Sequence, residues 1–167
     1  MTFDDFEGFS GLVLDNDWRL LGQKVVLRIP NSKHEVSQYH GRMSTIPLDR
    51  WQLRKCFVVE AKPKWKGHPF SRRILFIDEQ TYSVAMSLIF DRSDKLFKVI
   101  SVVYGRVDSK GKNVLGDSVP NFRSTNVINL RDDIASLGGV TRETAYPQLK
   151  VREVRKLFSV SSLTSGR

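Results

Sequence analysis

Cysteine and long apolar runs are what this sequence most plainly lacks. Cys56 is the single cysteine in 167 residues, which excludes a disulfide within the chain and any zinc or iron–sulfur site built from several cysteines. No apolar run approaches the roughly 20 residues of a transmembrane helix. The first residues, "MTFDDFEGFSG", lack the basic and apolar regions of a secretory signal. The sequence therefore predicts neither a signal peptide in these residues nor a membrane-spanning helix.

Catalytic and metal-binding patterns are equally scarce. Asp78 and Glu79 are adjacent, so on a turn between two strands their carboxylates point apart instead of converging on a substrate. Cys56 has no evident partner base, and no glycine-rich loop has the strand and helix context of a phosphate-binding motif. The histidines lie at no metal-ligand spacing: His34, His40 and His68. We therefore expect a protein that is not an enzyme and needs no cofactor.

Basic residues, by contrast, are abundant. The chain has 27 Lys and Arg against 18 Asp and Glu, a net charge of +9 and a pI near 9.9. This excess favours anionic partners such as nucleic acid, phospholipid headgroups or lipopolysaccharide, and charge alone does not rank them. The length and the 40% hydrophobic content are typical of a globular protein. We expect a single domain over residues 1–167.

The middle of the chain predicts antiparallel strands. In "TYSVAMSLIF" (81–90), large apolar residues alternate with mostly small or polar ones, the period of a strand with one buried face. The next run, "KLFKVISVVY" (95–104), is rich in β-branched and aromatic residues. Between them "DRSDK" has turn chemistry, which pairs Asp91 with Lys95. That pairing predicts these opposite residues: Phe90 and Leu96, Leu88 and Lys98, Met86 and Ile100, Val84 and Val102, Tyr82 and Tyr104.

A preceding strand, "RRILFID", is expected to join the same sheet through a loop at residues 78–81. This hairpin would put Leu75 opposite Val84 and Ile77 opposite Tyr82. The two hairpins together predict one apolar face, made of Leu75, Ile77, Tyr82, Val84, Met86, Leu88, Phe90, Ile100, Val102 and Tyr104. Core beneath a covering helix is the ordinary interpretation of such a face.

The rest of the chain completes a mainly β fold of the α+β class. We expect a meander of strands at 51–61, 72–78, 81–90 and 95–104, with a further strand near "STNVINL". Segments 30–50 and 105–123 contain prolines and glycines and predict loops. "LKVREVRKLF" (149–158) is compatible with a short C-terminal amphipathic helix, and Ser159 is a candidate cap for a further turn.

The stretch "KPKWKGHPFSRR" (62–73) connects two of these strands. Pro63 and Pro69 exclude a regular helix or a central strand, so an exposed basic loop is expected. A solvated loop is the ordinary interpretation, and binding to an anionic membrane surface or partner protein is the functional one. Nucleic acid ranks behind these, because the sheet lacks the exposed aromatic pattern of single-strand binders. The candidate anion-binding residues are Lys62, Lys64, Trp65, Lys66, Arg72 and Arg73.

Several of these stretches together resemble a known family. "RWQLRKCFVVEAKPKWKGHPFSRRILFIDEQTYSV", followed by "FDRSDKLFKV", is similar to the domain of unknown function family 1329, whose members carry Arg-x-x-L-R-x-x-x-V-V-E-A, His-Pro-Tyr-x-x-Arg, Tyr-x-Asp-Glu-x-Thr-Trp and Tyr-Asp-x-x-Gly-x-Leu-Trp segments in this order. "FEGFSG" and "FSVSSLTSGR" extend the likeness over residues 6–167. Asp94 replaces the glycine of the last turn, and four aromatic positions change: Phe76, Tyr82, Phe90 and Phe97.

The resemblance implies a fold and a function. The family is similar to the periplasmic lipoprotein carriers (LolA/LolB-like), in which a curved antiparallel half-barrel takes acyl chains on its concave face. It implies that this chain is the C-terminal part of a longer protein of the periplasm or outer-membrane periphery. The expected role is binding or transfer of a lipid or lipid-linked hydrophobic ligand, so the predicted apolar face is plain core or cavity lining. An adaptor that docks on an envelope transporter or outer-membrane protein is the alternative, and a nucleic-acid-binding module comes third.

Overall fold

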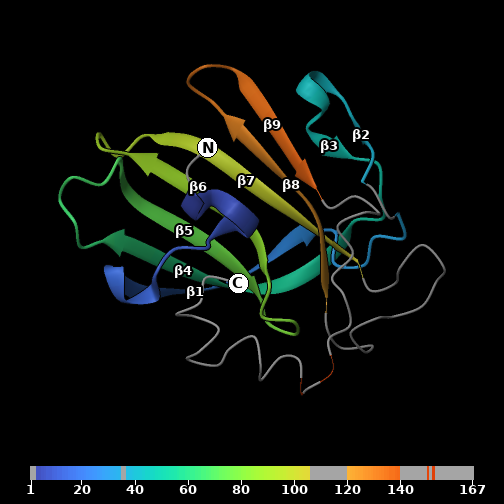
Figure 1. Cartoon of the computed structure of the whole chain (residues 1–167), viewed down its shortest axis with the longest axis horizontal. Coiled ribbons are helices and arrows are strands. Elements are labelled where there is room, and N and C mark those ends of the chain that lie inside the picture. The colour runs from blue at the N-terminus through green and yellow to red at the C-terminus, as the bar shows by residue number, and fades with distance from the viewer. Residues whose placement is uncertain (1–2, 35–36, 106–119, 140–149, 151, 153–167) are drawn as a thin grey trace.

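The computed structural model describes residues 3–34, 37–105, 120–139, 150 and 152, with side chains from Asp5 onward except that of Phe6. Within this part, a seven-stranded antiparallel sheet has the order β1-β4-β5-β6-β7-β8-β9, and a small two-stranded sheet pairs β2 with β3 (Figure 1). The strands are β1 (Asn16–Arg28), β2 (Tyr39–His40), β3 (Ile46–Pro47), β4 (Gln52–Pro63), β5 (Phe70–Asp78), β6 (Val84–Asp91), β7 (Leu96–Gly105), β8 (Asn121–Asn129) and β9 (Ile134–Gly139).

Three short 3₁₀ helices complete the described elements: η1 (Phe3–Gly8), η2 (Val13–Asp15) and η3 (Arg42–Ser44). η1 packs on β6, β7 and β8 and lies in front of the sheet in Figure 1. We call the side of the sheet that η1 covers the η1 face, and the other side the opposite face. In the described chain β1 and β9 are the two ends of the sheet, which is not closed into a barrel.

The predicted meander is confirmed as β4, β5, β6 and β7, followed by β8 at "STNVINL". The long strand β1 was not predicted, nor was β9. The short elements β2, η3 and β3 lie inside the predicted loop at 30–50. The predicted C-terminal helix falls almost entirely outside the described residues.

The turn between β6 and β7 has the predicted chemistry. Asp91 accepts hydrogen bonds on its Oδ1 from the backbone N–H groups of Ser93 and Lys95, and its own N–H donates to the carbonyl of Lys95 at 2.9 Å. Asp94 lies in the left-handed region with φ 59°. Aspartate visits this region more readily than most residues, so it tolerates the position at which the family pattern has glycine.

The predicted register beyond this turn is wrong by one residue. Phe90 pairs with Leu96 as expected, but a bulge follows, and Met86 pairs with Ser101 while Ser87 pairs with Ile100. The extra residue in β7 moves every later β7 residue to the side of the sheet opposite the predicted one, so Ile100 and Met86 lie on different faces.

The hairpin between β5 and β6 is also longer than predicted. Leu75 pairs with Ser87, and Ile77 pairs with Val84 across a second irregularity. Tyr82 lies outside both strands, in the turn, with φ 55° and three quarters of its surface exposed. It therefore belongs to neither face of the sheet.

Two apolar clusters form the core, one on each side of the sheet. The cluster on the η1 face contains Phe70, Ile89, Ile100, Val102, Tyr104, Phe122 and Val127, with Phe97 packed against it. The cluster on the opposite face contains Cys56, Val58, Ile74, Phe76 and Ala85, with Val26, Met86, Leu88 and Phe90 around it. Burial on both sides explains why β5 reads as a nearly continuous apolar run instead of a clean alternation.

Candidate functional site

The candidate site is an apolar surface on the η1 face of β1 and β4. Leu20, Val25, Leu27 and Leu53 are 64%, 63%, 60% and 69% exposed, and Trp18 is 36% exposed. The register places them together, because Trp18 pairs with Ala61, Leu20 with Val59, Val25 with Lys55 and Leu27 with Leu53. We call these five exposed residues the β1 strip: Trp18, Leu20, Val25, Leu27 and Leu53.

A bulge in β1 brings the strip onto one face. The pairing with β4 shifts between Leu20 and Gly22, so even-numbered residues before the bulge and odd-numbered residues after it share a side. Arg19 and Lys24 lie on the other side and are exposed. Large aliphatic side chains that stay accessible to water on a whole strand indicate an interaction surface more often than isolated exposed leucines do.

η1 determines where the strip ends and the core begins. Asp5 is fully buried and accepts a hydrogen bond from Arg73 Nη2 at 3.0 Å and another from Lys98 Nζ at 3.0 Å. Arg73 Nη1 also donates to the carbonyl of Gly8 at 2.7 Å. These three contacts bind η1 over β5–β7, so that within the described residues it does not extend over β1 and the start of β4.

Gly8 is needed for this close approach. Its φ is +86°, and a Cβ there would lie 2.6 Å from Val84 Cγ1. Only glycine adopts this conformation without strain and without a collision. The sequence motif "FEGFSG" therefore corresponds to the end of η1 where it packs on β6 and β7.

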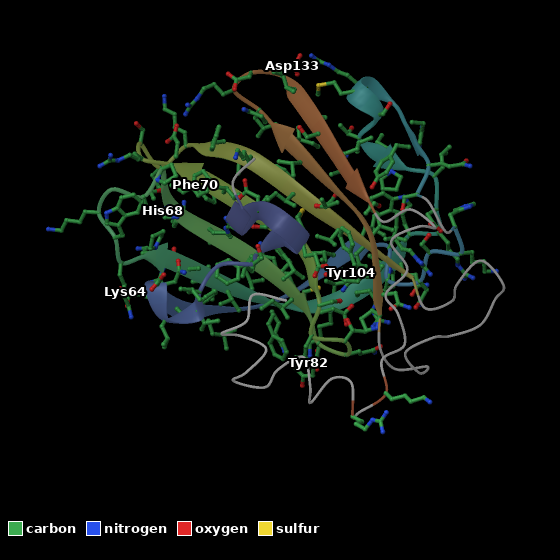
Figure 2. All side chains as sticks on the ribbon, viewed as in Figure 1. Lys64, His68, Phe70, Tyr82, Tyr104 and Asp133 are labelled. Atoms are coloured by element: carbon green, nitrogen blue, oxygen red, sulfur yellow. The ribbon has the colours of Figure 1, made fainter. Side chains whose placement is uncertain are left out.

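The predicted apolar face is divided by the structure. The η1 face carries Leu75, Ile77, Val84, Ile100, Val102 and Tyr104, whereas Met86, Leu88 and Phe90 lie on the opposite face. Leu75, Ile100, Val102 and Tyr104 are buried. Tyr82 lies in an exposed turn, away from Tyr104 (Figure 2). These ten residues do not form one surface.

The predicted anion-binding residues are divided as well. Lys62, Lys64, Trp65 and Lys66 are exposed at one end of the sheet, where Figure 2 shows Lys64. Arg73 is buried against Asp5. Arg72 binds Asp94 through Nε at 2.6 Å and stacks its guanidinium 3.6 Å from the Phe90 ring centre. Neither arginine is presented to an external anion as predicted.

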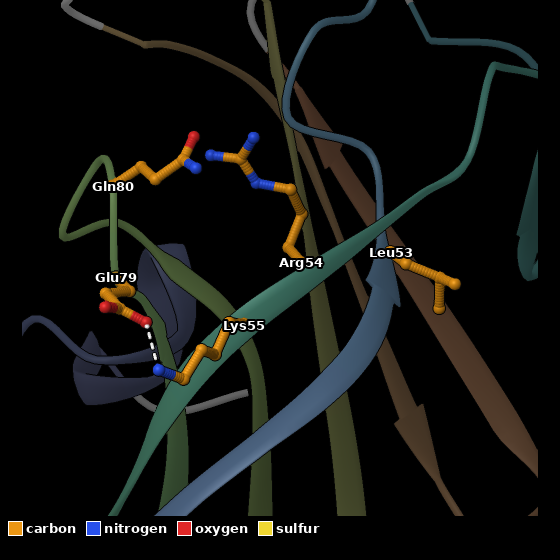
Figure 3. A pocket seen from close by; sticks show the side chains of 5 residues that line it. All are labelled: Leu53, Arg54, Lys55, Glu79 and Gln80. Carbon is orange, nitrogen blue, oxygen red and sulfur yellow. Dashed lines mark ion pairs between the residues drawn. The ribbon is translucent and has the colours of Figure 1, made fainter.

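A pocket lies at the other end of the sheet, beside Leu53. It has a volume of about 330 Å³ and is lined by Leu53, Arg54, Lys55, Glu79 and Gln80. Lys55 and Glu79 face each other across it and form an ion pair of 3.3 Å (Figure 3). The β1 strip therefore runs from Trp18 toward a polar pocket at Leu53.

Asp78 organises this end of the sheet through two arginines. Burial alone raises the pKa of its carboxyl, but hydrogen bonds from Arg54 and from the Gln80 N–H, with the charge of Arg28, lower it to about 2. Arg54 binds both carboxylate oxygens, at 2.9 and 3.1 Å, and Arg28 lies 3.1 Å from Oδ2. A carboxylate held in its charged form by two arginines is a poor proton donor at neutral pH.

Cys56 is buried in the apolar cluster on the opposite face. Burial, followed by the charge of Asp78, raises the pKa of the Cys56 thiol, so it is not an activated nucleophile. Among the described residues no group of three or more His, Cys, Asp or Glu side chains is placed to hold a metal ion. Nor does the described part contain a helix that is long and apolar enough to cross a membrane.

Sequence reasoning missed the β1 strip. "DWRLLGQKVVLR" contains the alternating pairs Trp18 with Leu20 and Val25 with Leu27, but they differ in parity. A strict period of two therefore assigns the two pairs to opposite faces. The bulge at Leu21 places both pairs on the same face. The glycine inside the run was the available signal, because isolated glycines in strands often mark bulges.

Comparisons with known proteins agree with the sequence resemblance. Over residues 1–164 the sequence matches the family described as Protein of unknown function (DUF1329). None of the curated proteins searched matches this sequence. The fold is similar to a domain from Vibrio parahaemolyticus named for outer membrane lipoprotein sorting, with a TM-score of 0.53 at 14% identity. That match covers 93% of this chain and 52% of the other.

Two further crystal structures match with lower scores. A DUF1329 family protein from Desulfovibrio piger ATCC 29098 has a TM-score of 0.48 at 16% identity, over 89% of this chain and 47% of that one. A LolA superfamily protein from Nitrosomonas europaea has a TM-score of 0.46 at 12% identity, over 92% and 53%. The chain thus spans about half the length of each structure. Because the family match extends over nearly the whole sequence, the protein belongs to the DUF1329 family.

Proposed function

We propose that this protein binds or transfers a lipid or another hydrophobic ligand in the bacterial cell envelope, and that the β1 strip contacts the ligand. The proposal rests on the exposed strip, because covering water-exposed leucine and valine side chains with an apolar molecule lowers the free energy. The similarity of the fold to a domain named for outer membrane lipoprotein sorting supports the same role and an envelope location.

The mechanism would be passive binding without a chemical step. Each buried methylene contributes about 0.8 kcal/mol, so an acyl chain lying over the strip can be held without any specific polar contact. The half-buried Phe57 and Val59 continue the apolar surface from β1 to the middle of β4. Lys55, on the same side of β4 as Leu53, would meet the polar end of such a ligand.

Binding of a fluorescent fatty acid tests the proposal. Val25→Glu and Leu27→Glu each place a carboxylate in the strip, and desolvating it under an acyl chain is strongly unfavourable. We expect either change to abolish binding while the circular dichroism spectrum keeps its strand signal. Leu137→Glu on β9 is the matched control, because Leu137 is similarly exposed but lies at the other end of the sheet. Full binding by a folded Leu27→Glu protein would refute the assignment of the strip.

An adaptor that docks on an envelope transporter is the second candidate, and the free edge of β1 favours it. No described strand pairs with the outer edge of β1, and a long unpaired edge can add a strand from a partner protein. Extraction of purified protein followed by lipid mass spectrometry separates the two roles. Recovered lipid that disappears with Leu27→Glu supports the carrier, whereas a lipid-free protein with an intact strip supports the adaptor.

A further inference from the structure

Four strongly exposed apolar side chains gather at one end of the sheet, where β1 begins and β4 ends. Leu12, Val13 and Leu14 are 72%, 63% and 84% exposed, and Trp65 is 68% exposed. We call these four residues the apolar tip. The Leu12–Leu14 segment immediately precedes β1, and Trp65 follows β4 in the loop to β5. Side chains of this size are rarely left in water together without a partner.

Hydrogen bonds hold the tip in place. The N–H of Lys64 donates to the carbonyl of Asp15 and its Nζ donates to the carbonyl of Leu14, both at 2.9 Å. Trp18 Nε1 donates to the carbonyl of Val13 at 2.7 Å. The backbone of the Leu12–Leu14 segment is thus fixed to β1 and to the loop after β4. The Leu12–Leu14 part of the tip is therefore preformed.

Cations outnumber carboxylates around the tip. Lys62, Lys66 and Arg92 are exposed near it, and Arg92 Nη2 donates to the carbonyl of Lys66 at 3.4 Å. Among the acidic residues nearby, Glu60 binds Arg19 at 3.1 Å, whereas Lys62 lies 3.8 Å from Glu60 and Lys64 lies 3.9 Å from Asp17. The two long pairs involve exposed lysines and contribute little, so Lys62 and Lys64 can still bind an external anion.

We propose that this end of the sheet docks on an anionic lipid bilayer, with the apolar tip entering the interface and the surrounding lysines and arginines binding lipid phosphates. Leucine and valine bury well among acyl chains, and tryptophan favours the boundary between headgroups and chains. The same aliphatic side chains cannot stack on nucleic-acid bases, which disfavours single-stranded DNA or RNA as the occupant of the tip.

The tip is continuous with the β1 strip. Trp18 is the first residue of the strip and donates its indole N–H to Val13 in the tip. A hydrophobic molecule leaving a bilayer at the tip would meet Trp18 and then Leu20 along the same strand. The docking proposal does not depend on this transfer, because a surface can bind vesicles whether or not the strip carries a ligand.

Vesicle co-sedimentation tests the docking surface with two kinds of change. Leu14→Ser removes an apolar side chain that makes no packing contribution, and Lys66→Glu reverses one charge. We expect Leu14→Ser to weaken binding to phosphatidylcholine vesicles containing phosphatidylglycerol by about tenfold at any salt concentration. Lys66→Glu should weaken it by more than about fivefold at low salt and much less at high salt. Leu137→Ser and Lys33→Glu, exposed at other places, should bind as the parent does.

Trp65 provides an independent readout. Its fluorescence should be quenched by brominated lipids in anionic vesicles, and the difference from a Trp65→Phe variant assigns the signal, since the chain has two other tryptophans. Binding of a monomeric fluorescent fatty acid, measured without vesicles, should be unchanged in Leu14→Ser, so failure of docking is distinguishable from failure of the ligand site.

Three outcomes would overturn the docking proposal. Parental vesicle binding by both folded variants would show that the tip and its cations are merely solvated. Loss of monomeric fatty-acid binding in Leu14→Ser would make the tip part of the ligand site instead. Tight single-stranded DNA binding at about 0.15 M salt, lost in Lys66→Glu and accompanied by no vesicle binding, would assign the basic end to nucleic acid.

Discussion

One face of a single sheet is used in two different ways in this protein. Over β6–β8, η1 covers the face, and Ile100, Val102 and Tyr104 are almost completely buried. Over β1, the same face leaves Val25 and Leu27 more than half exposed. Both regions are apolar, so composition does not distinguish them. The two regions differ in whether η1 covers them. An alternating apolar strand can therefore be core or exposed surface, depending on an element elsewhere in the chain.

The two regions are also secured by different buried carboxylates. Asp5 holds η1 on the covered region through Arg73 and Lys98. Asp78 joins Arg54 of β4 to Arg28 at the end of β1, at the pocket end of the uncovered region. Each carboxylate is fully buried, and each is shared by two cations. Disrupting one should affect its own region first.

The largest expected effect comes from Asp5→Asn. The change keeps the shape of the side chain but removes the charge that Arg73 and Lys98 share in a buried site, and such a loss typically costs about 3–5 kcal/mol. Urea unfolding should show this decrease. Binding of an apolar fluorescent dye should rise as η1 detaches from β6 and β7.

Asp17→Asn is the control for that experiment, because Asp17 is exposed on β1 and its nearest cation is 3.9 Å away. It should leave the unfolding free energy within about 0.5 kcal/mol of the parent. Equal effects of the two substitutions would contradict the role of Asp5 as the anchor of the covered region.

The second prediction concerns acid and the Asp78 cluster. The pKa of Asp78 is about 2 in the folded protein against an ordinary value of 3.8. A carboxyl whose folded pKa is depressed contributes stability above its unfolded pKa and loses that contribution as the pH falls through the folded value. Between about pH 4 and pH 2 the protein should therefore lose roughly 2 kcal/mol through this group. Asp78→Asn should be less stable at pH 7, and its unfolding free energy should lack this part of the acid dependence.

Much of the fold could be predicted from the sequence, because the signals that predict it come from residues close together in the chain. The period of two in 81–90, the turn residues of "DRSDK" and the family motifs each depend on neighbouring residues, and they correctly predicted β4–β8 and the turn between Asp91 and Lys95. The register could not be predicted, because the sequence around the extra residue in β7 near Phe97 does not differ from that of an ordinary strand.

The candidate site was harder to predict from the sequence, again because bulges change which face a side chain lies on. The bulge in β7 separates Met86 from Ile100, and the irregularity between β5 and β6 separates it from Val84, so the predicted ten-residue surface does not exist as one face. The β1 strip was not predicted, because the bulge in β1 places even-numbered residues before it and odd-numbered residues after it on the same face. Which part of a face stays uncovered depends on where η1 docks, and that depends on a contact between Asp5 and Lys98 that spans most of the chain. Sequence periodicity contains no information about such a contact.

Gly8→Ala tests how closely η1 must approach the covered region. The added methyl would lie 2.6 Å from Val84 Cγ1 at a backbone φ of +86°, so both overlap and strain oppose it. We expect a loss of about 1–3 kcal/mol in the free energy of unfolding. Gly138→Ala in β9 is the matched control, since its Cβ would meet Thr125 at an ordinary 3.4 Å. A stable Gly8→Ala protein would show that η1 can lift from Val84 without cost.

The smallest effect is expected in the uncovered region, from Leu27→Ala. Leu27 is 60% exposed, so its truncation leaves no cavity and should change the unfolding free energy by less than about 0.5 kcal/mol. Ile100→Ala, a comparable truncation on the same face under the core, should cost about 2–5 kcal/mol. Fatty-acid binding should show the reverse order, because a ligand over the strip buries Leu27 while Ile100 is already buried. If Leu27→Ala instead destabilised the protein as much as Ile100→Ala, with a loss that depended on protein concentration, a second copy of the chain would be covering the β1 strip in solution.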